Sequence, residues 1–196
     1  MSQKKEPSLL RLVLVLTLIA LVAGLALTGV YALTKEPIEQ AQLQKKQRAL
    51  TLVIPDFKGE MIDTVFQDET GTDLPVHIAL NENGGIYGVA VETYTKKAFS
   101  GRFDLMVGFN SNGTITNTEV IKANETPGLG DKINKDKSNF AEQFNHKNPN
   151  DFKIMVKKDG GDVDAITAAT ISSRAYCDAV NRAVAIYNAV KEVYHE

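Results

Sequence analysis

The chain has 196 residues, with 22 basic and 24 acidic side chains and a formal net charge of -2. This length suits one soluble domain with additional segments. The near-neutral balance, without a basic patch interleaved with aromatic residues, argues against nucleic-acid binding.

The cysteine and histidine content limits the chemistry further. One cysteine, Cys177, excludes an internal disulfide and also a self-contained iron–sulfur cluster, which needs about four thiolate ligands. Any redox chemistry must therefore use another cofactor. Cys177 lies in a predicted helix, where we expect a small buried hydrophobe and not a reactive thiol. His77, His146 and His195 are far apart in the sequence, so we assign no metal site.

The N-terminal part is predicted to cross a membrane. Residues 12–33 carry no charge, and as a helix they would extend roughly 33 Å, enough for the hydrocarbon core. A cleaved signal peptide is the alternative, because Val30-Tyr31-Ala32 resembles a cleavage site. The apolar run is longer than the ~7–15 residues of a signal sequence, which favours an uncleaved anchor.

We predict a cytoplasmic tail at residues 1–11, a transmembrane helix at 12–33, a stalk helix at 34–55 and an extracytoplasmic domain at 56–196. By the positive-inside rule the orientation is nearly undecided, because basic residues flank the span on both sides. The basic residues on the two sides of the span are Lys4, Lys5 and Arg11, and Lys35, Lys45, Lys46 and Arg48. Those closest to the span favour a cytoplasmic N-terminus.

The following region has the two-residue period of a half-buried sheet. Strands are expected at residues 76–80, 86–95, 101–110 and 114–122, with Gly-containing turns at 83–85 and 111–113. Residues 59–73 are mixed, and 62–66 are one strand candidate within a segment that the pattern leaves open. Residues 140–144 indicate a short helix, and 152–156 alternate again. Residues 174–194 have the three-to-four spacing of an amphipathic helix, with Ser172 or Ser173 as N-cap. The predicted class is α+β: a small antiparallel sheet with flanking helices, after one transmembrane helix.

Two motifs stand out. Asp164-Ala165-Ile166-Thr167-Ala168-Ala169-Thr170-Ile171-Ser172-Ser173 places hydroxyls and small residues at the entry of the last helix, where free amides and the helix dipole favour an anion such as phosphate. Glu125-Thr126-Pro127-Gly128-Leu129-Gly130-Asp131-Lys132 is a tight loop whose glycines would let a flat ring approach the backbone. Taken singly, an ordinary capped helix and a surface turn remain the alternatives.

Together the motifs resemble those of the FMN-binding domain family found in ion-pumping redox complexes. The family pattern of Asp, two variable residues, Ser or Thr, a small residue, Ala and Thr falls on Asp164, Thr167, Ala168, Ala169 and Thr170. The small position is usually Gly and is Ala168 here. The similarity covers approximately residues 84–190, and within the family the chain looks most like the G subunit of Rnf-type electron transport complexes.

The resemblance implies FMN bound covalently to Thr170 through a phosphoester. The other implied cofactor-binding residues are Asp164, Thr167, Ala168, Ala169, Ser172, Glu125, Thr126, Gly128, Leu129 and Gly130, while Ser173 and Lys132 have open roles. It also implies a redox subunit, inactive alone, of a bacterial inner-membrane translocase, with its main domain on the periplasmic side. The implied partners are other membrane, iron–sulfur and flavin subunits and a maturing flavin transferase.

Three other functions remain open at this stage. One is the C subunit of a sodium-translocating NADH:quinone oxidoreductase, which shares the local chemistry but has other partners. Another is a tethered module that binds FMN non-covalently as a sensor or adaptor. The third is an independent extracytoplasmic flavin reductase, which would turn over alone with a soluble donor.

Overall fold

The structure is a computed structural model that describes residues 8–57 and 59–194. The predictions that concern Lys4, Lys5 and His195 lie outside these residues. The chain forms two compact units, Met1–Gln44 and Lys45–Glu196.

The N-terminal helix α1 runs from Leu9 to Val53. The sequence predicted a membrane helix followed by a separate stalk helix, and the structure joins them into one element. Pro37 lies inside this helix, where it removes one backbone hydrogen bond. The apolar part of α1 is long enough and apolar enough to cross a membrane, and it is not buried against protein.

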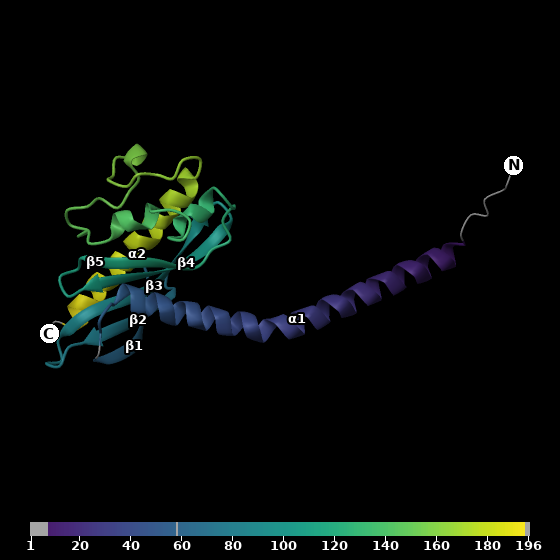
Figure 1. Cartoon of the computed structure of the whole chain (residues 1–196), viewed down its shortest axis with the longest axis horizontal. Coiled ribbons are helices and arrows are strands. Elements are labelled where there is room, and N and C mark those ends of the chain that lie inside the picture. Colours follow the sequence, from purple (N-terminus) through teal and green to yellow (C-terminus); the bar gives the residue numbers. More distant parts are fainter. Residues whose placement is uncertain (1–7, 58, 195–196) are drawn as a thin grey trace. The chain divides into compact units, whose positions relative to one another are not determined.

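Five strands form one antiparallel sheet in the order β1-β2-β3-β4-β5 (Figure 1). The bounds are β1 Glu60–Gln67, β2 Asp73–Leu80, β3 Ile86–Ala98, β4 Gly101–Asn110 and β5 Ile115–Lys122. This confirms the predicted α+β class and the four predicted strands, whose bounds shift by a few residues. The segment that the pattern left open forms β1, which includes the candidate at 62–66. Gly84 and Gly113 occupy the two predicted turns with φ of 78° and 82°, a conformation that favours glycine.

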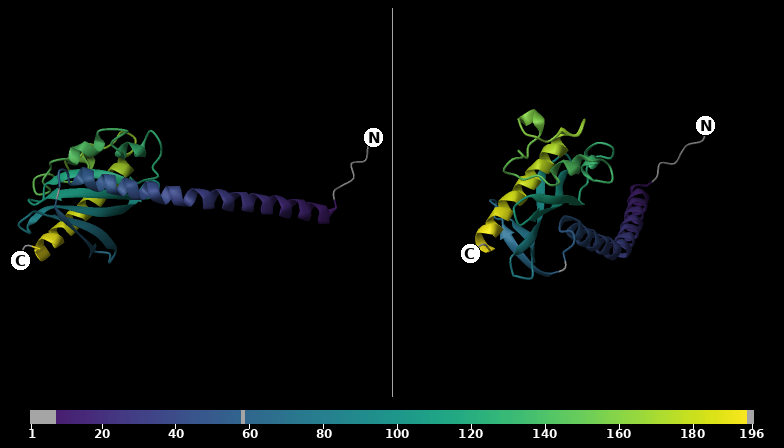
Figure 2. Two further views of the ribbon diagram at one scale, coloured as in Figure 1. Left: turned by 60° about the horizontal axis from the view of Figure 1, so that its bottom comes forward. Right: turned by 60° about the vertical axis from the view of Figure 1, so that its left-hand side comes forward.

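The C-terminal helix α2, Thr170–Tyr194, covers one face of the sheet (Figures 1 and 2). The alternating residues of β4 that point to this face are buried with the apolar stripe of the helix, as the sequence predicted: Phe103, Leu105, Val107 and Phe109 with Tyr176, Ala179, Val180, Ala183, Tyr187 and Val190. The two ladders of apolar side chains form the main core.

The start of α2 corrects one prediction. The helix begins at Thr170, so Ser172 and Ser173 lie inside its first turn and are not N-caps. The reason is tertiary: Ser173 Oγ accepts the Ile166 N–H at 2.9 Å and donates to the Ala169 carbonyl at 3.0 Å. Ser172 Oγ donates to the Glu125 carboxylate.

The last turns of α1 pack on the other face of the sheet. Ala49, Val53 and Ile54 are buried there with Ala79, Ala90, Met106 and Ile121. The helix ends where its free carbonyls find donors on β5: Asn117 Nδ2 reaches the Leu52 carbonyl at 3.0 Å, and Thr116 Oγ1 donates to that of Val53. Gly108 permits the approach, since a Cβ there would lie 2.7 Å from Val53 Cβ.

Three short 3-10 helices connect β5 to α2: η1 Gly130–Ile133, η2 Phe140–Phe144 and η3 Lys157–Asp159. The predicted helix at 140–144 is therefore confirmed as a 3-10 helix. Phe140 and Phe144 pack on Tyr176 with ring centroids 5.3 and 5.1 Å apart. The alternating segment 152–156 contributes one isolated bridge, between Val156 and Val163, and no regular strand. These contacts fix the loop after β5 beside the start of α2.

Candidate cofactor site

A pocket of about 310 Å³ lies where the loop after β5 meets the start of α2. The loop contributes Glu125, Thr126, Leu129 and Gly130, and the helix entry contributes Ala168, Ala169, Thr170 and Ser172. The two motifs, distant in sequence, thus form one site, and its volume is at the lower end of the range of small-molecule pockets.

The helix entry supplies a site for an anion. The first bond of α2 joins Ser173 N to the Ala169 carbonyl at 3.0 Å, so the amides of Thr170, Ile171 and Ser172 have no partner within the helix. The first turn carries no acidic side chain. A 25-residue helix adds the positive end of its dipole. Thr170, the first helical residue, is half-buried in the pocket wall.

Ala168 turns the chain into the helix with a φ of 63°. This left-handed conformation costs a residue with a Cβ about 1–2 kcal/mol, which gives a physical reason why glycine would suit the position. The alanine keeps the turn but places local backbone strain two residues before Thr170.

Glu125 is a buried carboxylate, 8 % exposed, that joins three segments. Its Oε1 accepts the Ser100 N–H of the β3–β4 hairpin at 2.9 Å, and its Oε2 accepts the Ser172 hydroxyl of α2. Gly130 makes room for this clamp, because a Cβ there would overlap Glu125 Oε2 and lie 2.6 Å from Ser172 Oγ. The second glycine of the loop is therefore required for packing beneath the pocket.

Three residues of the predicted site do not line the pocket: Asp164, Thr167 and Gly128. The Asp164 carboxylate is exposed and paired with Lys157 Nζ at 2.7 Å. Its backbone is held by Gln143 Oε1, which accepts the Asp164 N–H at 2.8 Å. Thr167 is exposed as well, and Gly128 serves the loop turn with a φ of 76°. Lys132, whose role was open, lies in η1 and is not part of the pocket wall.

Sequence reasoning missed two residues of the pocket wall, Phe99 and Ile171. Phe99 is a single aromatic residue at a hairpin turn, outside both motifs. Ile171 lies inside the motif from Asp164 to Ser173, and its exposure was not expected of an apolar residue at a helix start. The signal that could have identified Phe99 is a large apolar side chain in a segment otherwise composed of lysine, alanine, serine and glycine.

Cys177 is buried in α2, 4 % exposed, as predicted. Burial raises the pKa of its thiol to about 12, which suppresses the reactive thiolate. Within residues 8–57 and 59–194, no group of three or more His, Cys, Asp and Glu side chains is arranged to hold a metal ion.

Two family models match parts of this chain. The model of the FMN-binding domain matches residues 98–185, a range that includes the whole pocket from Phe99 to Ser172. The model of the RnfG N-terminal region matches residues 1–53, which end where α1 ends. Residues 98–185 are thus similar to an FMN-binding domain, and they come after an N-terminal apolar helix.

The similar proteins reported next share one name, and this chain covers most of the length of each. The G subunit of the ion-translocating oxidoreductase complex of Shewanella baltica is 36 % identical over 187 residues, covering 88 % of this chain and 86 % of the relative. That of Vibrio cholerae is 35 % identical over 193 residues, covering 93 % and 91 %. The chain belongs to this family, the G-subunit family of ion-translocating oxidoreductase complexes. The crystal structure of Shewanella oneidensis NqrC is also similar, with a TM-score of 0.43 and 21 % identity, covering 62 % of this chain and 61 % of that chain.

Proposed function

We propose that this chain is a membrane-anchored electron carrier of an Rnf-type complex, with FMN attached to Thr170 through a phosphoester bond. One observation carries the proposal: Thr170 opens a 25-residue helix and lies in the wall of the same pocket as the loop from Glu125 to Gly130. Membership of a family of ion-translocating oxidoreductase components supports the redox role.

The residues present suit FMN. The free amides at the start of α2 and the helix dipole offset the charge of a phosphodiester, and the apolar side chains around the pocket suit a flat ring system. Thr170, Ala169 and the first-turn amides would hold the phosphate, while Leu129 and Gly130 would border the ring. FMN supplies electron transfer in steps of one or two electrons, which lets it connect one-electron iron–sulfur centres to other carriers.

The attachment requires a separate enzyme. A threonine hydroxyl is a weak nucleophile without a base, and the carboxylate in the pocket, Glu125, is already bonded to Ser100 and Ser172. We therefore propose maturation by a flavin transferase that uses FAD: the Thr170 oxygen would bond to the phosphorus of the FMN half, the pyrophosphate bond would break, AMP would leave, and a base of the transferase would take the hydroxyl proton. Asp164 is exposed outside the pocket, where such an enzyme could recognise it.

The remaining features fit an electron relay, and not the pump or the dehydrogenase. The apolar part of α1 carries no charge that could line an ion pathway, and no G-x-G-x-x-G fingerprint for NAD is present. We propose an inner-membrane anchor at residues 12–33, a periplasmic domain, and electron exchange with other membrane, iron–sulfur and flavin subunits. The whole complex would couple electron flow between ferredoxin and NAD to transport of Na⁺ or H⁺.

Flavin fluorescence of the denatured protein tests this proposal. The full-length chain, produced together with the transferase, should give a fluorescent band after denaturing electrophoresis, and Thr170→Val should abolish it. Thr51→Val is the matched control, because Thr51 is an exposed threonine of α1 that lies outside both motifs and does not line the pocket. Its band should remain fluorescent. Peptide mapping should locate the added mass on Thr170, and an unmodified Thr170 in fully matured protein would sink the proposal.

The same experiment distinguishes the other candidates. A non-covalent FMN sensor or adaptor would lose its flavin on denaturation and dialysis. The C subunit of a quinone reductase would retain it, but would purify with the other components of that enzyme.

A further inference from the structure

Three apolar side chains border the pocket and remain accessible. Phe99 is 68 % exposed, Ile171 48 % and Leu129 42 %. They come from three separate segments: the β3–β4 hairpin, the start of α2 and the loop after β5. Single exposed apolar residues are ordinary, but three around one pocket form an apolar wall of the kind that binds a flat, poorly hydrated group.

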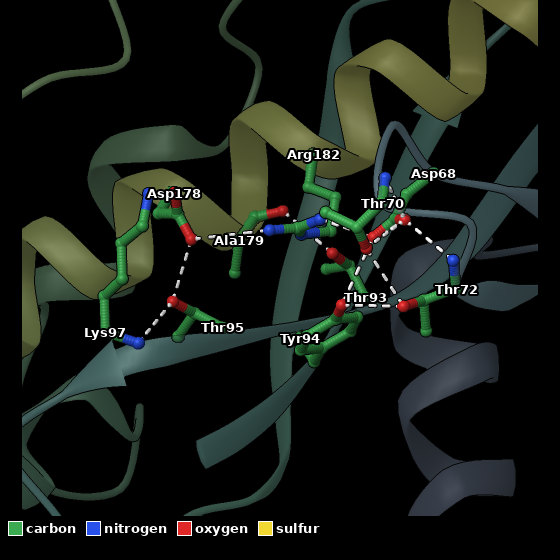
Figure 3. A network of polar contacts seen from close by, with 10 residues as sticks. All are labelled: Asp68, Thr70, Thr72, Thr93, Tyr94, Thr95, Lys97, Asp178, Ala179 and Arg182. Carbon is green, nitrogen blue, oxygen red and sulfur yellow. Dashed lines mark hydrogen bonds and ion pairs between the residues drawn. The ribbon is translucent and has the colours of Figure 1, made fainter. Parts of the chain in front are cut away.

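The hairpin that carries Phe99 is anchored before the aromatic residue. Thr95, fully buried, donates to Asp178 Oδ2 at 2.8 Å, and Lys97 Nζ lies 2.5 Å from Asp178 Oδ1 (Figure 3). Both bonds fix the end of β3 to α2, the helix that begins with Thr170. The same figure shows that Arg182, one turn further along α2, bonds to Asp68 of the β1–β2 connection.

The hairpin is also anchored directly after Phe99. The Ser100 N–H donates to Glu125 Oε1 at 2.9 Å, and Glu125 in turn accepts the Ser172 hydroxyl. Phe99 therefore lies between two fixed residues, which hold its backbone at the pocket while most of its side chain is open to solvent. A backbone that is fixed beforehand does not have to be ordered when a ligand binds, which lowers the cost of binding.

The polar and apolar groups of the pocket are separated. The anion-binding amides are at the start of α2, and the buried carboxylate of Glu125 is already satisfied by two donors. The accessible wall is apolar. We propose that Phe99 contacts the isoalloxazine ring and shields it from solvent, with Leu129 and Ile171 as the rest of the apolar seat. This inference rests on the proposed attachment of FMN at Thr170 and adds a ring-binding residue outside both sequence motifs.

Solvent access to the native flavin tests this role. Full-length flavinylated protein is compared with Phe99→Ala, Phe99→Tyr and Met155→Ala, the last being an exposed apolar residue that does not line the pocket. All should carry the same covalent flavin, because Thr170 is unchanged. Quenching of the native flavin fluorescence by iodide should rise toward that of free FMN in Phe99→Ala alone. Phe99→Tyr should behave as wild type, because the ring is kept.

Equal quenching in Phe99→Ala and wild type would overturn the inference while leaving the covalent flavin intact. A second result would also overturn it: Phe99→Ala keeps wild-type quenching but no longer co-purifies with the other subunits. Phe99 would then contact a partner and not the flavin.

A second measurement does not depend on covalent attachment. FMN is titrated into Thr170→Val with and without Phe99→Ala, and the second change should raise the dissociation constant roughly 2- to 10-fold, as expected for one lost aromatic contact. Equal constants, or no binding in either protein, would overturn the inference even if the wild-type chain proved to lack flavin.

Discussion

Single positions around the pocket restrict which residue fits there, and Ala168 is the clearest case because of its backbone conformation. Its φ of 63° is strained for alanine, so Ala168→Gly should raise the free energy of unfolding by roughly 0.5–1 kcal/mol after the larger chain entropy of glycine is included. Ala165→Gly is the control, because Ala165 is not among the residues with positive φ, and it should lower stability. Urea unfolding of the detergent-solubilised chain measures both.

At Gly130, in contrast, glycine is needed because the packing leaves no room for a side chain. Gly130→Ala should cost about 1–3 kcal/mol of stability, because the new Cβ would displace the Glu125–Ser172 pair. The cause can be isolated with a double-mutant cycle. In a Glu125→Ala background the displaced carboxylate is absent, so the same glycine change should cost less. Additive losses would show that the clash with Glu125 is not the reason.

At the scale of elements, alternation predicted the strands well because one face of the sheet is buried and the period of two is a local property. The start of α2 was not predictable in the same way. Ser172 and Ser173 are good N-caps in sequence, but their hydroxyls bond to Glu125 and to the segment before the helix. Phe99 was missed for the same reason, since its role depends on the distant segments that meet beside it.

The two motifs were predicted to form one site, and eight of the eleven predicted site residues line the pocket. Asp164, Thr167 and Gly128 lie outside its wall, because the positive-φ turn at Ala168 separates the first two from the helix and Gly128 is at the outer bend of its loop. Whether Asp164 matters for attachment stays a prediction, which the sequence pattern and not the pocket supports.

A series of ion pairs links four elements on the face of the sheet that packs on α1. Lys46 of α1 lies 2.5 Å from Glu92 of β3, and His77 of β2 lies 3.4 Å from Glu92 and 2.6 Å from Asp63 of β1. The hydrogen bond to Glu92 raises the pKa of His77 despite its burial, and Asp63 adds to the shift. Protonated His77 therefore stabilises the folded state.

The raised pKa of His77 makes the free energy of unfolding depend on pH. A raised folded-state pKa means that the stabilisation is complete below the unfolded value of about 6.5 and is lost as pH rises through the higher folded value. Chemical unfolding followed by the near-ultraviolet circular dichroism of the tyrosines should show this loss as pH rises above about 6.5. His77→Gln should remove it, and His146→Gln should retain it. The same decline in both variants would contradict the assignment to His77.

The whole molecule combines a membrane-compatible helix with a domain built to hold a cofactor, and the side of the membrane on which the domain lies decides its partners. The buried Cys177 leaves the wild-type chain without an accessible thiol among the described residues, so single introduced cysteines can report topology. Glu82→Cys lies in the exposed β2–β3 turn, and Ser8→Cys lies directly before α1. With a periplasmic domain, a membrane-impermeant maleimide should label Glu82→Cys in spheroplasts and Ser8→Cys only after lysis. The reverse pattern would place the pocket in the cytoplasm, where lost FMN can be replaced, and would remove the physical advantage of a covalent attachment.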